Sequence, residues 1–212
     1  MLKINEIFKS IQGESSHTGL PCTFVRLTGC NLRCGYCDTE YAFYNGNEMS
    51  VEDVVKSVDG LGIKLVEITG GEPLLQEEVY PLMKAFLQNN YTVMLETGGS
   101  LSIEKVPQAV IKIVDLKCPG SGEVGKNNYD NLNRLGPKDE VKFVVLDRAD
   151  YEWTRETISR YNINQKATIL LSPVFDKLDL KSLAEWVLQD NLPARLQTQL
   201  HKFIWDKNAI GV

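Results

Sequence analysis

Short apolar segments typical of buried strands alternate with amphipathic segments along this chain of 212 residues. The strand-like segments cover 22–27, 64–69, 91–96, 111–116, 141–146 and 168–171, and helical patterns are expected over about 50–58, 77–88, 151–160 and 180–189. This alternation implies parallel strands joined by right-handed crossovers. About six units are present, fewer than in a closed eight-stranded barrel. The sequence therefore predicts an α/β fold, an incomplete, open (β/α) barrel with an N-terminal strand or hairpin extension.

The chain is expected to form a single domain over 1–212, because no linker, repeat or low-complexity segment interrupts it. Its net charge of -5 argues against non-specific nucleic-acid or membrane binding through a basic surface. No signal peptide and no apolar stretch of about 20 residues is present, so a soluble cytoplasmic protein is expected. In that compartment the five cysteines should be reduced, and clustered cysteines are then metal ligands rather than disulfides.

Three of these cysteines, Cys30, Cys34 and Cys37, follow the first apolar strand with C-x3-C-x2-C spacing. Structural zinc usually takes four protein ligands, and an ordinary four-iron cluster takes one cysteine per iron. Three thiolates on a four-iron cluster would leave one iron open to an external ligand. The alternative is a structural zinc site completed by His17, His201 or Cys118, although the second close Cys or His pair of zinc modules is missing.

Polar and glycine-rich segments follow the later strands, at 69–73, 96–99 and 115–117. Ligands of such folds bind at the carboxyl ends of the strands, so these loops should share one rim with the cysteines. Gly71 would let the backbone approach a ligand closely, and Glu72 offers a carboxylate for an ammonium group. Arg26, on a strand buried on both faces, would need an anionic partner.

Taken together, the cysteine motif and Thr-Gly-Gly-Glu-Pro resemble the radical S-adenosylmethionine superfamily. The wider series Ile-Gln-Gly-Glu, Phe-Val-Arg, Gly-Cys-Asn-Leu-Arg-Cys-Gly-Tyr-Cys-Asp-Thr, Thr-Gly-Gly-Glu-Pro, Glu-Thr-Gly-Gly and Asp-Leu-Lys is similar to the 7-carboxy-7-deazaguanine synthases. The resemblance implies a lyase of queuosine and 7-deazapurine biosynthesis. Such an enzyme converts 6-carboxy-5,6,7,8-tetrahydropterin to 7-carboxy-7-deazaguanine with ring contraction and loss of ammonia.

The resemblance also implies cofactors and ligands for particular residues. It implies one [4Fe-4S] cluster on the three cysteines, S-adenosylmethionine on the open iron, and Mg²⁺ held by the hydroxyl of Thr39. For S-adenosylmethionine it implies contacts with Tyr36, Gly71, Glu72, Glu96, Asp115, Leu116, Lys117, Ser172, Pro173, Val174 and Phe175. For the substrate it implies contacts with Ile11, Gln12, Gly13, Arg26, Thr69, His201 and Val212. His201 is equally compatible with a hydrogen-bonded strand histidine, and Glu96 with a carboxylate at the edge of the core.

The implied partners are the pterin, an electron donor such as a flavodoxin or ferredoxin, and a second copy of the chain in a homodimer. Two alternatives remain at this point. Another radical S-adenosylmethionine enzyme, such as a glycyl-radical activase, would share the cysteine motif, but the segments 12–14 and 38–39 argue against it. A non-enzymatic zinc-binding module would hold one metal ion and no cluster.

Overall fold

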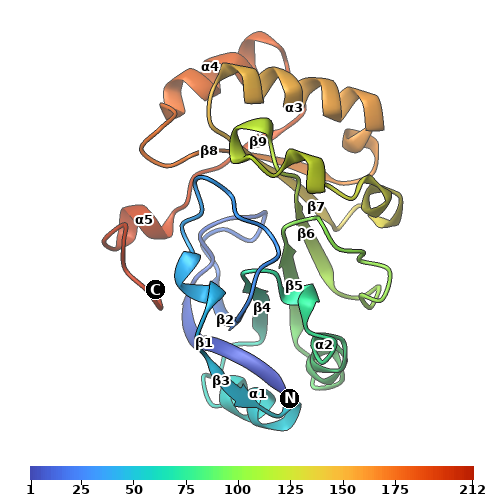
Figure 1. The fold of residues 1–212 in the computed structure, drawn as a ribbon, viewed down its shortest axis with the longest axis vertical. Coiled ribbons are helices and arrows are strands. Elements are labelled where there is room, and N and C mark those ends of the chain that lie inside the picture. The colour runs from blue at the N-terminus through green and yellow to red at the C-terminus, as the bar shows by residue number, and fades with distance from the viewer.

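The computed structural model describes residues 1–212 and contains one sheet of nine strands in the order β3-β1-β2-β4-β5-β6-β7-β8-β9 (Figure 1). The strands are β1 (Leu2–Ile11), β2 (Pro21–Leu27), β3 (Asn47–Met49), β4 (Leu65–Gly70), β5 (Thr92–Thr97), β6 (Ile111–Asp115), β7 (Glu140–Val145), β8 (Thr168–Pro173) and β9 (Arg195–Leu196). All neighbours from β2 to β9 are parallel. The edge strands β3 and β9 do not pair with each other, which confirms the predicted open barrel.

The N-terminal extension is a hairpin, because β1 runs antiparallel to β2, and the short β3 adds to its outer side. The α-helices are α1 (Val51–Asp59), α2 (Val79–Gln88), α3 (Arg148–Tyr161), α4 (Leu180–Gln189) and α5 (His201–Ile204). Ser50 caps α1, since its hydroxyl accepts a hydrogen bond from the Asp53 amide. None of the helices is long and apolar enough to cross a membrane.

The strands match the prediction of about six repeating units better than the helices do. The connections from β5 to β6 and from β6 to β7 contain no α-helix, and the second is built from short 3₁₀ turns. These turns cover Pro119–Ser121, Val124–Lys126 and Tyr129–Arg134. Proline, glycine and asparagine dominate this stretch and favour turns over continuous helix. Helices therefore cover the outside of the sheet at its two ends and leave its middle to irregular chain.

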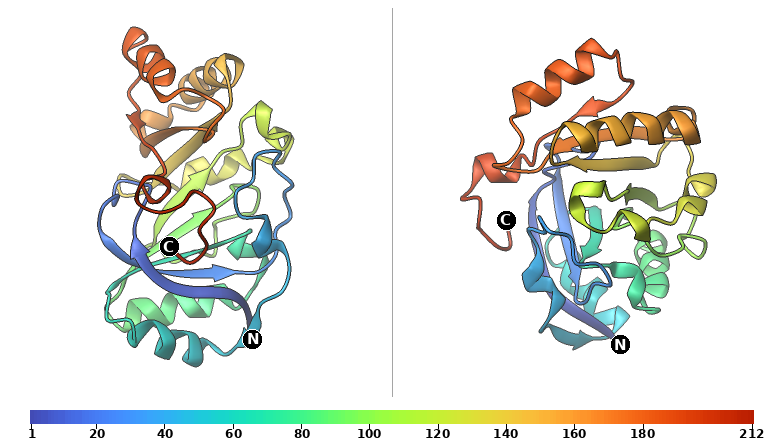
Figure 2. Two further views of the ribbon diagram at one scale, coloured as in Figure 1. Left: turned by 90° about the vertical axis from the view of Figure 1, so that its left-hand side faces the viewer. Right: turned by 45° about the horizontal axis from the view of Figure 1, so that its top comes forward.

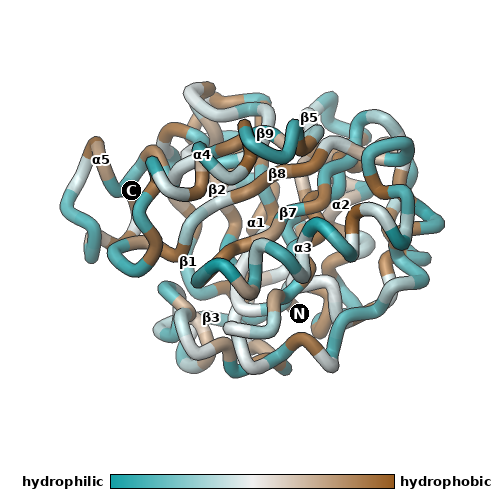
Figure 3. Tube along the Cα trace, turned by 90° about the horizontal axis from the view of Figure 1, so that it is seen from above, coloured by the Kyte–Doolittle hydropathy of each residue, from teal (hydrophilic) through white to brown (hydrophobic).

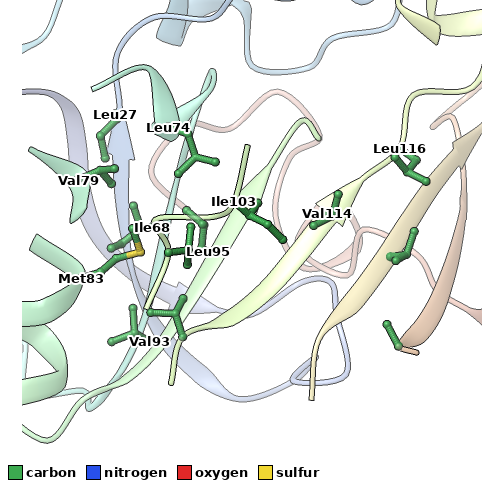
Figure 4. Packing of buried hydrophobic residues seen from close by; sticks show 14 of the residues in the cluster. Leu27, Ile68, Leu74, Val79, Met83, Val93, Leu95, Ile103, Val114 and Leu116 are labelled. Carbon is green, nitrogen blue, oxygen red and sulfur yellow. The ribbon is translucent and has the colours of Figure 1, made fainter. Parts of the chain in front are cut away.

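The main core lies between the sheet and these outer helices. Val66 and Ile68 of β4 point outward and pack with Met83 of α2, as Figure 4 shows for Ile68 and Met83. Side chains alternate along a strand, so the intervening residues point to the inner, concave face. Figure 3 shows the same division along the chain, with hydrophobic stretches in β7 and β8 and mostly hydrophilic colour on α3.

The last part of the chain returns to the first. After β9 it passes α5 and ends beside β1, on the open side of the barrel (Figure 2). The Leu200 amide donates to the Gly13 carbonyl oxygen, which ties this segment to the end of the β1–β2 hairpin. The C-terminal segment, residues 197–212, thus lies beside the carboxyl ends of the parallel strands.

Candidate active site

The concave face of the sheet holds the main pocket, and the residues that line it come from nearly every strand and from the loops at their carboxyl ends. Along each strand they alternate with core residues, as Arg26 does in β2 and Lys142 in β7. The predicted site residues that line the pocket are Ile11, Gln12, Gly13, Arg26, Cys30, Cys34, Tyr36, Cys37, Thr39, Thr69, Gly71, Glu96, Asp115, Lys117, Val174, His201 and Val212. The fold therefore brings together most of the residues that the motifs indicated.

The cysteine loop presents three free, half-buried thiols to this pocket. The Tyr36 hydroxyl donates to the Val144 carbonyl oxygen over 3.0 Å, and the Gly35 amide donates to the Ser121 carbonyl oxygen over 2.9 Å, so the loop is fastened to the far side of the sheet. Burial raises the pKa of the Cys34 thiol to about 11, against the opposing effect of the Lys117 ammonium. Because metals bind thiolates, ligation here must displace protons.

The glycine pair after β4 packs directly against the cysteine loop. A Cβ atom at Gly71 would lie 2.3 Å from the Gly29 carbonyl oxygen and 2.7 Å from Cys30 Cβ. Gly70 has a φ of 151°, a conformation that side chains disfavour. Only glycine therefore allows the turn to lie this close to the first cysteine.

The role expected for Glu72 needs correction, because its carboxylate does not reach the pocket surface. Glu72 is fully buried, and its oxygens accept hydrogen bonds from Thr97 Oγ1 and from the Leu74 and Gly98 amides. These bonds satisfy the carboxylate within the protein. Glu72 accordingly joins the turn after β4 to the turn after β5. Of Glu72 and its partner Gly98, only Gly98 lines the pocket.

Four further residues that were expected to contact S-adenosylmethionine lie outside the pocket lining. Leu116 is fully buried in the hydrophobic core. Ser172 is buried in β8 and accepts a hydrogen bond from Gln197. Pro173 ends β8, and Phe175 packs edge-on against Phe203. None of these four lines the pocket, and of the segment 172–175 only Val174 does.

A buried lysine joins the carboxylates of the pocket floor. Lys142 Nζ lies 2.8 Å from Glu14 Oε2, contacts Glu96 Oε1, and lies 3.8 Å from Asp115 Oδ2. Burial opposes the charge on Lys142, but these carboxylates outweigh burial and raise its pKa. Lys117 Nζ lies 2.7 Å from the same oxygen of Asp115. One charge network thus links the hairpin end to the strand ends near the cysteines.

The anionic partner expected for Arg26 is Glu6, whose Oε1 lies 2.7 Å from Arg26 Nε. The guanidinium group also lies over the rings of Phe8 and Tyr41, each about 5.8 Å from its carbon. The Tyr41 hydroxyl donates to the same Glu6 oxygen. Arg26 is therefore held in place before any ligand binds, with its guanidinium group at the edge of the pocket.

The C-terminal segment adds side chains that no motif indicated. Lys202 Nζ lies 2.7 Å from Asp38 Oδ2, and Gln199 Nε2 donates to both Asp38 and Glu14. His201 belongs to α5 and not to a strand, which corrects that alternative. A Cβ at Gly13 would lie 2.3 Å from His201 Nδ1, so the glycine leaves room for the ring.

Sequence reasoning did not assign several lining residues, among them the polar or charged side chains of Glu14, Glu67, Lys142, Gln199 and Lys202. Two of these residues could have been found from the sequence. Glu67 and Lys142 each interrupt an apolar strand with one charge, and ionisable residues are almost never fully buried without a partner. For the other three, the relevant contacts depend on how distant segments meet.

The residues present fit the expected iron–sulfur cluster and a polar cofactor beside it. The three thiols are free of disulfides and point into one pocket, and soft thiolates are the usual ligands of iron–sulfur clusters. Asp115 lines the same pocket, and its Oδ1 atom is fully buried without a hydrogen-bond partner in the protein. No group of three His, Cys, Asp or Glu side chains is arranged to hold a single metal ion.

Comparison with known proteins agrees with these features. The model of the radical SAM superfamily matches residues 24–118. The 7-carboxy-7-deazaguanine synthase of Koribacter versatilis is 48% identical over 226 residues, covering 100% of both chains. That of Chlorobaculum tepidum is 44% identical and covers 100% of this chain and 97% of its own. The crystal structure of QueE from Escherichia coli matches 94% of each chain with a TM-score of 0.77 and 25% identity.

Proposed function

Since this chain belongs to the 7-carboxy-7-deazaguanine synthase family of radical S-adenosylmethionine enzymes, we propose that the concave pocket is its active site. The enzyme is a lyase that uses a [4Fe-4S] cluster and S-adenosylmethionine on a small molecule. The substrate is 6-carboxy-5,6,7,8-tetrahydropterin and the product 7-carboxy-7-deazaguanine. The observation that carries the proposal is the convergence of the three cysteines with Gln12, Arg26 and Thr69 on one pocket. The single continuous main core supports treating residues 1–212 as one domain.

Two groups of residues divide the work within the pocket. Cys30, Cys34 and Cys37 hold the cluster, and one-electron cleavage of S-adenosylmethionine is the chemistry that these cofactors supply when bound. Gly71, Gly98, Asp115 and Lys117 form the side of the pocket next to the cysteines, so they bind S-adenosylmethionine. They offer backbone groups, the Asp115 carboxylate and the Lys117 cation, which suit the amino-acid part of that cofactor.

The hairpin end and the C-terminal segment form the substrate side. Ile11, Gln12, Gly13, Arg26 and Thr69 line it together with His201 and Val212. The aromatic rings of Phe8 and Phe24 stack at 5.1 Å between centroids beside Arg26 and give this side an apolar wall for a flat ring. With the C-terminal segment across the open side of the barrel, these residues orient the pterin and limit its contact with water.

Thr39 and Asp38 are the proposed Mg²⁺ site. The Thr39 hydroxyl donates to Asp38 Oδ1 over 2.9 Å. Although partial burial opposes ionisation, the Lys202 ammonium and Gln199 amide hold the pKa of Asp38 well below its usual range. An ionised carboxylate beside a hydroxyl provides hard oxygen atoms, which Mg²⁺ prefers, and the substrate carboxylate and water can complete its coordination.

Replacing Thr39 by alanine should lower turnover by about 10- to 100-fold and leave the iron content unchanged, because a metal-bound oxygen is lost while the cysteines stay in place. The variant should also need more Mg²⁺ for half-maximal rate. Titrating Mg²⁺ into anaerobic assays tests this, with Thr39→Ser as the matched control that keeps the hydroxyl. An unaltered Mg²⁺ dependence in the alanine variant would remove Thr39 from the site.

We further infer that a flavodoxin- or ferredoxin-type protein supplies the electron, that the chain acts as a homodimer, and that it works in the cytoplasm, where the thiols stay reduced. The negative net charge gives no support for nucleic acid as a partner. Light scattering of the purified protein tests the homodimer directly.

The direct test of function is an anaerobic assay with the reconstituted, reduced protein, S-adenosylmethionine, Mg²⁺ and the carboxypterin. Mass spectrometry should detect 7-carboxy-7-deazaguanine and ammonia should be released. Formation of 5′-deoxyadenosine without any deazaguanine would favour a different radical enzyme, such as a glycyl-radical activase. A colourless protein with one tightly bound zinc ion would favour the zinc-binding module.

A further inference from the structure

Glu67 is a charged side chain in the middle of a buried strand. Its neighbours in β4, Val66 and Ile68, are fully buried and point into the outer core, where Figure 4 shows Ile68 beside Met83. Glu67 therefore points to the concave face, like Thr69 two residues later, and both line the pocket. Only 3% of Glu67 is exposed, so its carboxylate belongs to the floor of the pocket and not to a solvated rim.

The carboxylate of Glu67 is only half satisfied by the protein. Its Oε2 atom accepts a hydrogen bond from Gln12 Nε2. No protein group donates to its Oε1 atom. This atom is not fully enclosed by the protein, so a ligand can reach it. The nearby cation, Lys142, is engaged by Glu14 and Glu96. A carboxylate oxygen that opens only to the pocket has a free acceptor site for a ligand.

The charges around Glu67 specify what that ligand should present. Glu14 and Glu96 lie on the same floor, so another anion would be repelled there, whereas N–H donors would be attracted. A pterin carries an N–H and an amino group side by side on its 2-amino-4-oxo edge. This donor pair matches the two oxygens of a carboxylate, as a guanidinium group does.

We propose that Glu67 is the specificity residue that binds the 2-amino-4-oxo edge of the pterin, with Gln12 holding its carboxylate in position. The proposal rests on the proposed function and adds the group that recognises this end of the substrate. In this orientation the donor edge of the pterin faces Glu67 on β4, and the carboxylate of the pterin points toward Arg26 and the Thr39 site.

The electrostatics of Glu67 give a readout that separates substrate binding from a structural role. Burial, together with the charge of Glu96, raises the pKa of Glu67. A carboxyl group whose pKa is raised on folding lowers stability once the pH exceeds its unfolded value, so an isosteric amide should relieve that cost near neutral pH. If Glu67 serves the ligand, its removal should weaken binding without weakening the ligand-free fold.

The experiment measures carboxypterin binding by calorimetry to the anaerobic, unreduced holoenzyme with S-adenosylmethionine bound. Glu67→Gln should bind about 10- to 100-fold more weakly, because a charge-assisted hydrogen bond to the substrate is replaced by a neutral amide. A pterin analogue without the 2-amino group should bind the wild-type protein more weakly by a similar factor. The variant should show little preference between the two ligands, since the discriminating acceptor is gone.

The matched control is Glu140→Gln, which also removes a buried strand carboxylate, but one that bonds to Ser16 outside the pocket. It should leave the affinity for both pterins unchanged. Thermal unfolding of the ligand-free Glu67→Gln variant should occur at the wild-type temperature or above it.

Equal affinity of Glu67→Gln and wild type for the carboxypterin would overturn the proposal while leaving the proposed function intact. So would an undiminished preference for the 2-amino group in the variant. A wild-type holoenzyme that neither binds nor converts the carboxypterin would remove the proposed function and this inference together.

Discussion

Cys34→Ala should abolish cluster binding and S-adenosylmethionine cleavage. With two thiolates left, the cluster lacks a protein ligand on a second iron. Loss of a residue that only supports a metal ligand lowers activity by up to about 100-fold, so loss of the ligand itself should lower it further. Iron and sulfide analysis after anaerobic reconstitution, with assay of 5′-deoxyadenosine, measures both effects.

Cys118→Ala is the matched control for this prediction. Its thiol is fully buried in the core, contacts Thr154 Oγ1 at 3.6 Å and does not line the pocket. This variant should keep near four iron atoms per chain, as a cubane on Cys30, Cys34 and Cys37 requires. A Cys34→Ala protein that retains its iron, or a Cys118→Ala protein that loses it, would mean that the wrong cysteines have been assigned.

Lys142→Met should cost the ligand-free chain about 3–5 kcal/mol of unfolding free energy, since it leaves Glu14, Glu96 and Asp115 buried around a missing cation. Turnover should fall to background, because the carboxylates of the pocket floor lose the charge that holds them. Urea unfolding with linear extrapolation gives the first quantity, and the deazaguanine assay gives the second.

The pH dependence of this stabilisation follows from the raised pKa of Lys142. A lysine whose pKa is raised on folding contributes its full stabilisation below the ordinary lysine pKa of about 10.4 and loses it as the pH rises through the higher folded value. The difference between wild type and Lys142→Met should therefore stay constant from neutral pH to about pH 9.

Lys112→Met is the matched control for Lys142. Lys112, on β6, is equally buried, and its Nζ atom lies 3.1 Å from Asp139 Oδ1. Neither residue lines the pocket. Its removal should destabilise the chain to a similar degree while the folded fraction keeps its affinity for S-adenosylmethionine and pterin. Comparable losses of ligand affinity in both variants would show that the effect of Lys142 is only structural.

The strands were predictable because β2 and β4–β8 carry apolar residues on their outward positions, and parallel strands need crossovers. The edge strands were not. β3 (Asn47–Met49) and β9 (Arg195–Leu196) are short and mostly polar or exposed, and they form through pairing with a neighbour. The stretch between β6 and β7 folds into 3₁₀ turns whose conformation depends on contacts such as that of Asn131 with the Leu101 carbonyl oxygen.

The motifs predicted the rim of the site but not its floor. The three cysteines have fixed spacing within one loop, so sequence alone brings them together. Lys142 and Glu14 are 128 residues apart, and only the parallel sheet and the hairpin place them in contact. Glu72 illustrates the opposite error: its position in the motif was right, but its hydrogen bonds to Thr97 and Gly98 turn the carboxylate away from the pocket.

The most direct test of the account is electron paramagnetic resonance of the reduced, oxygen-free protein, recorded with and without S-adenosylmethionine labelled with ¹⁵N and ¹⁷O at its methionyl amino and carboxylate groups. The account predicts that the labelled nuclei couple to the cluster, because one iron has no ligand from the chain. A cluster signal that S-adenosylmethionine leaves unchanged, with a fourth side chain of the protein bound to iron, would contradict it.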